Sequence, residues 1–296
     1  MSAIREIASG LRFPEGPIAL DDGSFLLVEI AAGQLTRIAP DGTKSVAAAN
    51  GGGPNGAAIG PDGRCYVCNN GGMHFHIIDG QHFPGHAHDD AQLGWVEAVD
   101  LATGEIEVLY RECDGNPLLA PNDQAFDTHG GFYFTDHGKA RKFSRDRGGV
   151  YYAKADGSSI RRVLTPMDQP NGIGISPDGS TLYVAETPTG RLWAFDIEAP
   201  GRIVKGTGPA PWAHGRILAS PLEYSLFDSL TVDAAGNVWV ATIPGRVTRV
   251  SPDGKSVTQF DMPDTLPTNV CFGPSADGPA YVTLSASGKL VAFDYD

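Results

Sequence analysis

The chain has 296 residues, 41% of them hydrophobic, and its 22 basic and 35 acidic residues give a formal net charge of −13. This charge argues against nucleic acid and anionic membrane as partners, and no apolar stretch approaches the length of a membrane span. The N-terminal residues lack the apolar segment of a secretory signal, so we expect a cytoplasmic protein.

One pattern recurs along the whole chain: a polar residue, an alternating strand, a glycine turn and a second strand, which together form a β-hairpin. In five copies the polar residue lies eight positions before the turn glycine: Glu15 and Gly23, Asn55 and Gly63, Asn122 and Gly130, Asn171 and Gly179, Asp228 and Gly236. A sixth copy, from Thr268 to Gly278, is two residues longer.

Further predicted strands follow each turn. The second strands are expected at residues 25–28, 65–68, 132–135, 182–185, 238–241 and 281–284. The third strands are expected at residues 34–38, 95–99, 150–153, 192–195, 247–250 and 290–293. Fourth strands are weaker, as at 106–110, 160–164 and 257–260. The sixth copy lacks one, and we expect residues 4–8 to supply it, closing the ring without a free edge.

Four antiparallel strands in six copies predict an all-β fold, a six-bladed β-propeller. Because the repeats run from end to end without a linker, residues 1–296 are interpreted as one domain. A β-sandwich is the alternative, but a sandwich does not require one register to recur six times.

Cys65 and Cys68 have the spacing of a redox or zinc pair. They lie on a predicted strand, where residues three apart point to opposite faces. We therefore expect two buried small hydrophobic side chains rather than a metal or disulfide pair.

The repeat predicts a ring of polar side chains, because equivalent positions in a propeller lie at equal radius and height. The ring would consist of Glu15, Asn55, Asn122, Asn171, Asp228 and Thr268, at one mouth of the central channel. Asn and Asp are also ordinary turn residues that bond to nearby backbone. That alternative accounts for a single Asn, but it accounts poorly for Glu15 and for oxygen-bearing side chains at all six positions.

Two carboxylates and several amide carbonyls, without histidine or cysteine, are typical of a site for a hard cation. Calcium binds six to eight oxygens, from carboxylates, amide carbonyls and water. Glu15 and Asp228 together would neutralise a divalent ion. The sequence therefore predicts one divalent cation, calcium in the first place, with magnesium, manganese or zinc as alternatives.

The same residues carry a family resemblance that extends over essentially the full chain. The motifs are Phe13-Pro-Glu-Gly-Pro17, Pro121-Asn-Asp123, Pro170-Asn-Gly172 and Asp228-Ser-Leu-Thr-Val-Asp233. In these the chain resembles the senescence marker protein/gluconolactonase (regucalcin-like) family, six-bladed propeller hydrolases that also resemble diisopropyl fluorophosphatase. The resemblance implies a metal-dependent lactonase that acts on a small-molecule lactone or ester.

By this resemblance Glu15, Asn171 and Asp228 match the metal ligands of the family. Asn122 matches an asparagine that contacts metal or substrate, where it would hold the substrate or donate to the developing oxyanion. Members that act on sugar lactones often have an arginine two residues before that asparagine, where this chain has Ala120. A lactone less polar than a sugar lactone is therefore expected.

Hydrolysis would use the cation as a Lewis acid toward the lactone carbonyl and the attacking water. The resemblance makes Asp228 the candidate catalytic base or nucleophile, and His137 is the alternative base. A phosphotriester hydrolase of the same fold and a non-catalytic binding propeller remain alternative functions. The sequence contains no Gly-x-Ser-x-Gly motif, which argues against a serine hydrolase.

An insertion at residues 71–93 contains five of the eight histidines: His74, His76, His82, His86 and His88. Clustered histidines can bind transition metals, but this spacing matches no zinc pattern, so a solvated flap is the preferred interpretation. If the flap covers the channel mouth, His74 and His76 would touch the substrate together with Asn55 and His137. Long loops on a rigid scaffold usually determine specificity.

Overall fold

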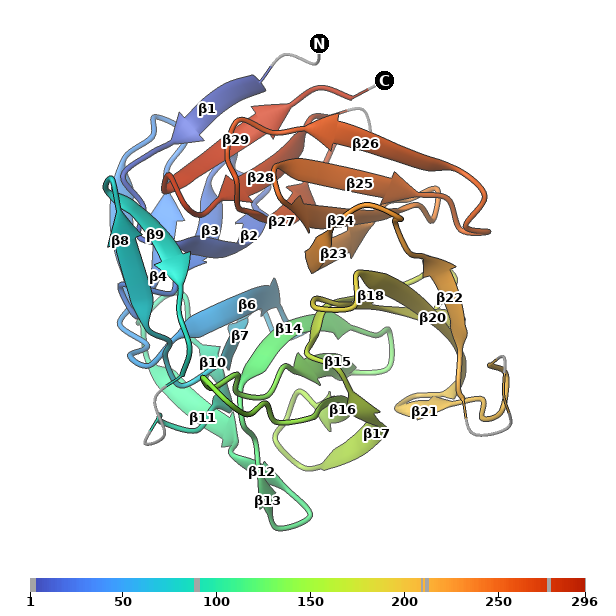
Figure 1. Cartoon of the computed structure of the whole chain (residues 1–296). Helices are drawn as coiled ribbons and strands as arrows, with labels where there is room; N and C mark the ends of the chain where they lie inside the picture. The colour runs from blue at the N-terminus through green and yellow to red at the C-terminus, as the bar shows by residue number, and fades with distance from the viewer. Residues whose placement is uncertain (1–3, 88–90, 209, 211–212, 276–277, 296) are drawn as a thin grey trace.

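The computed structural model describes residues 4–87, 91–208, 210, 213–275 and 278–295. These residues form strands and turns, and no helix among them is of the length and apolar character that crosses a membrane. Six antiparallel sheets stand as blades around a common axis (Figure 1). The predicted six-bladed β-propeller is confirmed.

Each blade runs outward from an innermost strand that begins next to a ring position. Blade 1 consists of β2 (Pro14–Ala19), β3 (Phe25–Glu29), β4 (Gln34–Ile38) and β5 (Lys44–Ala48). Blade 2 consists of β6 (Pro54–Ile59), β7 (Cys65–Asn69), β10 (Trp95–Val99) and β11 (Ile106–Tyr110). Blade 3 consists of β14 (Pro121–Phe126), β15 (Gly131–Asp136), β16 (Gly148–Lys154) and β17 (Ile160–Met167).

The other three blades follow the same order, with one variation in blade 4. Blade 4 consists of β18 (Pro170–Ile175), β19 (Thr181–Glu186) and β20 (Arg191–Ala199), whose outer edge pairs with both β21 (Arg202–Ile203) and β22 (Arg216–Ala219). Blade 5 consists of β23 (Leu226–Val232), β24 (Val238–Ile243), β25 (Arg246–Val250) and β26 (Val257–Asp261). Blade 6 consists of β27 (Pro267–Phe272), β28 (Ala280–Leu284), β29 (Lys289–Phe293) and β1 (Ile4–Ala8).

The ring closes where the two ends of the described chain meet. Strand β1 pairs antiparallel with β29, with Ile4 opposite Phe293 and Ala8 opposite Leu290. The expectation that residues 4–8 complete the last blade is therefore confirmed (Figure 1). Two ribbons lie outside the blades: β8 (Phe75–Ile78) with β9 (Gln81–Pro84), and β12 (Glu112–Cys113) with β13 (Asn116–Pro117).

The hydrophobic core is divided among the six contacts between neighbouring blades, each of which has its own cluster. Successive side chains on a strand point to opposite faces, so each second strand serves two clusters. Val28 packs toward blade 2 and Leu27 toward blade 6. Cys65 and Cys68, both fully buried and free, likewise lie in different clusters, which confirms the sequence interpretation.

The innermost strands pack backbone against backbone, which leaves no room for a side chain at some positions. A Cβ atom on Gly56, next to the ring residue Asn55, would lie 2.5 Å from the carbonyl oxygen of Asn122. A Cβ on Gly172, next to Asn171, would lie 2.5 Å from the amide nitrogen of Leu230. Glycine after these ring residues therefore permits the approach that brings the ring together.

We expect Gly56→Ala to destabilise the protein by about 1 to 3 kcal/mol, because the new methyl group meets the backbone of the next blade. Urea unfolding measures this change. Gly273→Ala is the matched control, since a Cβ there meets only the Tyr281 ring at 3.4 Å and the change should stay within about 0.5 kcal/mol. Equal stabilities of the two variants would contradict the close approach of the inner strands.

Candidate functional site

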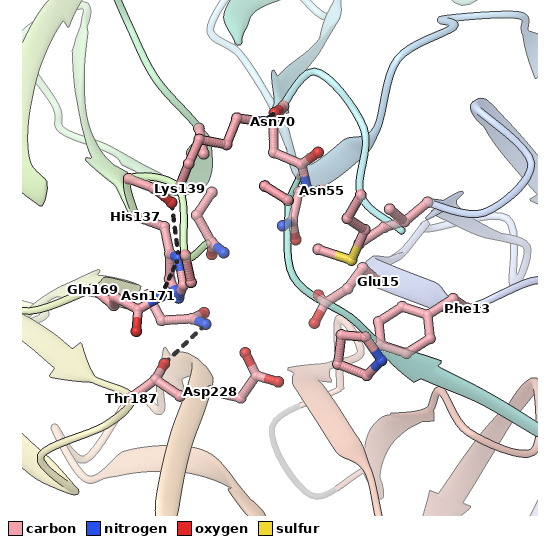
Figure 2. Close-up of a pocket in the computed structure, with 18 of the residues that line it drawn as sticks. Phe13, Glu15, Asn55, Asn70, His137, Lys139, Gln169, Asn171, Thr187 and Asp228 are labelled. Carbon is pink, nitrogen blue, oxygen red and sulfur yellow. Dashed lines mark hydrogen bonds between the residues drawn. The ribbon is translucent and has the colours of Figure 1, made fainter. Parts of the chain in front are cut away.

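One cavity of about 310 Å³ collects most of the predicted ring residues. Glu15, Asn55, Asn122, Asn171 and Asp228 all line it. Figure 2 shows Glu15, Asn55, Asn171 and Asp228 pointing inward from different blades. The volume lies within the range of small-molecule sites.

Thr268, the sixth ring position, does not line the cavity. Its hydroxyl contacts the hydroxyls of Thr283 (3.0 Å) and Ser285, and donates toward the carbonyl oxygen of Pro14 at 3.3 Å. The side chain thus ties blade 6 to blade 1. Five of the six predicted ring residues therefore line the cavity, while Thr268 has a structural role.

Carboxylates at the ends of second strands hold the segments that lead into the ring. The Glu29 carboxylate accepts a hydrogen bond from the backbone N–H of Arg12 at 2.7 Å. The Asp136 carboxylate accepts from the N–H groups of Leu119 and Ala120 at 2.7 and 2.8 Å. The Glu186 carboxylate accepts from Asp168 N–H at 2.8 Å. Each bond fixes the loop directly before an inner strand.

Glu15 is a buried carboxylate and Asp228 a half-buried one, and their charges repel each other. Burial, and then the charge of Asp228, raises the pKa of Glu15 well above its usual range, although hydrogen bonds from Asn269 and Gly16 partly oppose this. Burial also raises the pKa of Asp228, an effect that the Asn171 side chain opposes. Two neighbouring groups that both resist ionisation are typical of a site that binds positive charge.

A third buried carboxylate, Asp123, supports the ring from the neighbouring position. Its pKa is raised to about 7 by burial, despite hydrogen bonds from Gln124, Ser229, Leu230 and Ile173. These partners belong to blades 3, 4 and 5, so the Asp123 side chain joins three blades. The Ser229 hydroxyl oxygen also lies 3.3 Å from Asn171 Oδ1, so Ser229 stands between the Asp123 and Asn171 side chains.

The donor atoms of the cavity fit a hard divalent cation. Asn122 Oδ1 is buried and has no hydrogen-bond partner among the described residues, as expected of a ligand atom. Asn171 Nδ2 donates to Thr187 Oγ1 at 3.1 Å, which orients its amide. No cluster of three or more His, Cys, Asp or Glu side chains suited to a metal occurs within the described ranges. The fit therefore depends on amide oxygens beside the two carboxylates, a set that suits calcium.

The predicted substrate-binding histidines separate into two groups. His137 lines the cavity, and burial lowers its pKa to about 4. His74 and His76 are exposed on the β8–β9 side of the cavity and do not line it. Their rings contact each other, with centroids 5.0 Å apart. His88 lies outside the described residues.

Several cavity residues were not identified from the sequence. Lys139 is only 4% exposed, and its Nζ donates to the backbone oxygen of Asn70, which also lines the cavity. Burial lowers the pKa of Lys139, against the attraction of Asp136. Gln169 and Thr187 complete this polar side. All four residues follow or precede strands at the same end of the blades, and that placement is the signal that could have identified them.

The opposite side of the cavity is apolar. It is lined by Phe13, Ile30, Met73, Leu226, Ile243 and Leu266. The β8–β9 ribbon packs on this side, where the rings of Phe75 and Phe13 lie 4.9 Å apart between centroids. The ribbon places Met73 and Pro84 in the wall, so the predicted flap does shape the cavity, but through apolar residues.

Comparison with known proteins places these features in one family. The sequence profile described as "SMP-30/Gluconolactonase/LRE-like region" matches residues 13–286. A gluconolactonase of Zymomonas mobilis is 25% identical over 318 residues, which cover 97% of this chain and 80% of that protein. A lactonase drp35 of Staphylococcus haemolyticus is 28% identical over 253 residues, which cover 84% of this chain and 69% of that protein.

Solved structures agree on the fold. A gluconolactonase from Xanthomonas campestris superposes with a TM-score of 0.77 at 22% identity, covering 99% of this chain and 89% of the other. A calcium-binding protein, regucalcin, from Agrobacterium tumefaciens gives a TM-score of 0.75 at 20% identity, covering 99% and 93%. At these identities the superpositions support the propeller alone.

We expect Glu15→Gln to raise the Tm of cation-free protein at pH 8 by at least about 2 °C. The folded-state pKa of Glu15 is raised, so stability is lost as the pH rises from the unfolded-state pKa to the folded-state pKa, and the full penalty remains above that window. The gain should therefore shrink as the pH falls toward 5. Thermal unfolding in a chelator measures it.

Asp22→Asn is the control variant, because the pKa of Asp22 is shifted in the opposite direction to that of Glu15. The Ser24 hydroxyl and N–H, together with Arg37, lower the pKa of Asp22, so its charge favours the folded state at pH 8. Its removal should lower the Tm or leave it unchanged. A Tm for Glu15→Gln that falls at pH 8 would show that the carboxylate pair is not under repulsion.

Proposed function

Because the chain belongs to the SMP-30/gluconolactonase/LRE-like family, we propose that it is a hydrolase that opens lactone rings in the cavity of Glu15 and Asp228. The proposal rests on one observation: two mutually repelling carboxylates, buried Glu15 and half-buried Asp228, converge in one cavity with an Asn122 oxygen that has no partner among the described residues. Relatives named gluconolactonase and lactonase support lactone hydrolysis as the activity.

We propose that Glu15, Asn122, Asn171 and Asp228 hold one divalent cation, calcium in the first place. When bound, such an ion supplies Lewis acidity toward the lactone carbonyl and lowers the pKa of water. The chain contributes two carboxylates and two amide side chains to this set. Asn269 Nδ2 donates to Glu15 Oε2 at 2.8 Å, and Thr187 orients Asn171, so the side chains are held in place before any ligand arrives.

The chain's own residues account for the proton transfers. An Asp228 carboxylate oxygen takes a proton from the water as the water oxygen forms its bond to the lactone carbonyl carbon. The ring C–O bond then breaks, and Asp228 returns the proton to the departing alkoxide, which leaves a hydroxy acid. Asn122 Nδ2 donates to the developing oxyanion, a contribution that is worth about 3 kcal/mol in comparable sites.

The lining of the cavity favours a lactone less polar than a sugar lactone. Ala120, two residues before Asn122, lines the cavity and offers no side-chain hydrogen bond. Phe13, Ile30 and Ile243 form a continuous apolar surface on the other side. We propose that this surface receives an alkyl or aryl substituent of the substrate, since burying each methylene there contributes about 0.8 kcal/mol.

The proposed lactonase activity requires a bound divalent cation. Protein stripped with chelator should hydrolyse lactones at the background rate, and calcium should restore activity. Asp228→Asn should lower kcat by about 10³-fold or more, since it removes both a ligand charge and the base. Proton release from γ- and δ-lactones measures both effects.

The control for this experiment is Asp178→Asn, a surface turn residue of blade 4. It should keep full activity. If the calcium-loaded wild type binds the ion but cleaves a phosphotriester and no lactone, the phosphotriesterase alternative replaces this proposal. If it cleaves neither, the binding-propeller alternative does.

The apolar lining of the cavity sets the order of substrates that we expect. The kcat/KM for δ-decalactone should exceed that for glucono-δ-lactone by about tenfold or more. Met73→Gln keeps the side-chain length and adds a polar group to the apolar side, so it should lower kcat/KM for decalactone by about three- to tenfold. A preference of the wild type for the sugar lactone would contradict the assigned polarity.

A further inference from the structure

The polar side of the cavity contains an unusual concentration of hydrogen-bond donors, and the reaction described above uses none of them. Lys139, Asn70 and His137 line it together. Lys139 and Asn70 are each 4% exposed. Figure 2 shows Lys139 extending toward Asn70, with His137 below them and Glu15 and Asp228 across the cavity.

Two of the donors are identified directly by their hydrogen bonds. Lys139 Nζ uses one N–H on the backbone oxygen of Asn70, which leaves two of the three donors of an ammonium group. Asn70 Oδ1 accepts from Gly72 N–H at 2.8 Å, which fixes the orientation of the amide. The other end, Asn70 Nδ2, is buried without a partner among the described residues. A buried, unpartnered donor that lines a cavity indicates a ligand acceptor.

The third donor follows from a chain of hydrogen bonds behind His137. Arg145 Nη1 donates to Gln169 Oε1 at 3.1 Å, and a guanidinium cannot accept, so the amide oxygen of Gln169 must face it. Gln169 Nε2 then faces His137 Nδ1 at 3.2 Å and donates to it. Nδ1 is therefore the unprotonated nitrogen.

The tautomer determines what His137 can do. With Nδ1 accepting from Gln169, the 3.3 Å approach of Nδ1 to the carbonyl oxygen of Gly138 is a contact and not a hydrogen bond. The proton of the neutral ring lies on Nε2. His137 thus presents an N–H donor and not a lone pair, and the alternative role as general base, raised by the sequence, is not supported.

We propose that Asn70, His137 and Lys139 form a subsite that binds an acceptor-only oxygen of the substrate, an amide carbonyl or a carboxylate on the substituent next to the lactone ring. This inference rests on the proposed lactonase function and specifies its substrate. All three groups donate, and one of them is cationic, so the subsite favours a carbonyl or carboxylate over a hydroxyl.

Three isosteric lactones test the subsite: α-isobutyl-, α-acetamido- and α-carboxymethyl-γ-butyrolactone. They differ in whether the branch carries methyl groups, one carbonyl oxygen or a carboxylate. The calcium-loaded wild type should favour at least one oxygen-bearing lactone over the isobutyl lactone by about tenfold or more in kcat/KM. The two oxygen-bearing arms distinguish an amide carbonyl from a carboxylate.

The variants remove donors with little change of shape. Asn70→Asp keeps the acceptor for Gly72 and deletes the free donor, while Lys139→Met deletes the ammonium group. Both should reduce the preference for the oxygen-bearing lactone over the isobutyl lactone to about threefold or less. His137→Phe should act in the same way, and His137→Gln should restore part of the preference because its amide nitrogen reaches the Nε2 position. A preference unchanged in His137→Phe and Asn70→Asp would overturn the subsite even if Lys139→Met failed to fold.

The tautomer has its own readout, which does not depend on turnover. Nitrogen-15 NMR of cation-free protein should show His137 protonated at Nε2, with the signal assigned by its absence in His137→Gln. Gln169→Glu should move the proton to Nδ1, because a carboxylate accepts there. Arg145→Gln should leave a mixture of tautomers, whereas Arg147→Gln, which removes only the pair with Asp168, should change nothing.

Lactone kinetics and the NMR signal of His137 together distinguish a failure of the proposed lactonase function from a failure of the subsite. If the wild type opens no lactone, the proposed function fails. The subsite is then judged by whether α-acetamido-γ-butyrolactone, and not its isobutyl isostere, shifts the His137 Nε2 signal. Protonation at Nδ1 in the wild type, or equal shifts from both compounds, would overturn the subsite whatever the activity.

Discussion

The close approach of the innermost strands is the constraint on which the rest of the structure depends. Gly56 and Gly172 have no space for a side chain, because the backbone of the next blade lies within 2.5 Å of where a Cβ would be. This contact sets the radius of the channel. At that radius the side chains one position earlier, Asn55 and Asn171, reach the same cavity as Glu15 and Asp228. The site is therefore a consequence of how the blades pack.

The same packing explains why the loops of the site are held in place and why two carboxylates that repel each other lie close together there. Carboxylates such as Glu29 and Glu186 stabilise the entry loops by accepting hydrogen bonds from backbone N–H groups. Glu15 and Asp228 instead lie where both resist ionisation. The first arrangement stabilises the fold, and the second opposes it in the absence of a cation. A lower free energy of unfolding, caused by the repulsion between Glu15 and Asp228, is consistent with a binding function at this site.

Much of the fold followed from period-two patterning and a fixed distance from polar residue to turn glycine. That distance located the inner strands and five cavity residues, while the fourth strand missing from the sixth copy indicated the closing strand at residues 4–8. It failed at Thr268, where the spacing is longer and the hydroxyl bonds to Pro14. Lys139 and Asn70 were not identified, because they follow second strands, where the six copies share no residue type and only the common placement marks them. The tautomer of His137 depends on Arg145, which only the folded chain brings near.

The proposed cation-dependent lactonase site is best tested by a crystal structure of the protein grown with calcium and the hydroxy acid product of a lactone. We expect one ion bound by side-chain oxygens of Glu15, Asn122, Asn171 and Asp228, with the product carboxylate beside it. We also expect the substituent of the product to lie between the apolar side and Lys139. An ion bound elsewhere, or a product bound outside this cavity, would contradict the proposed site.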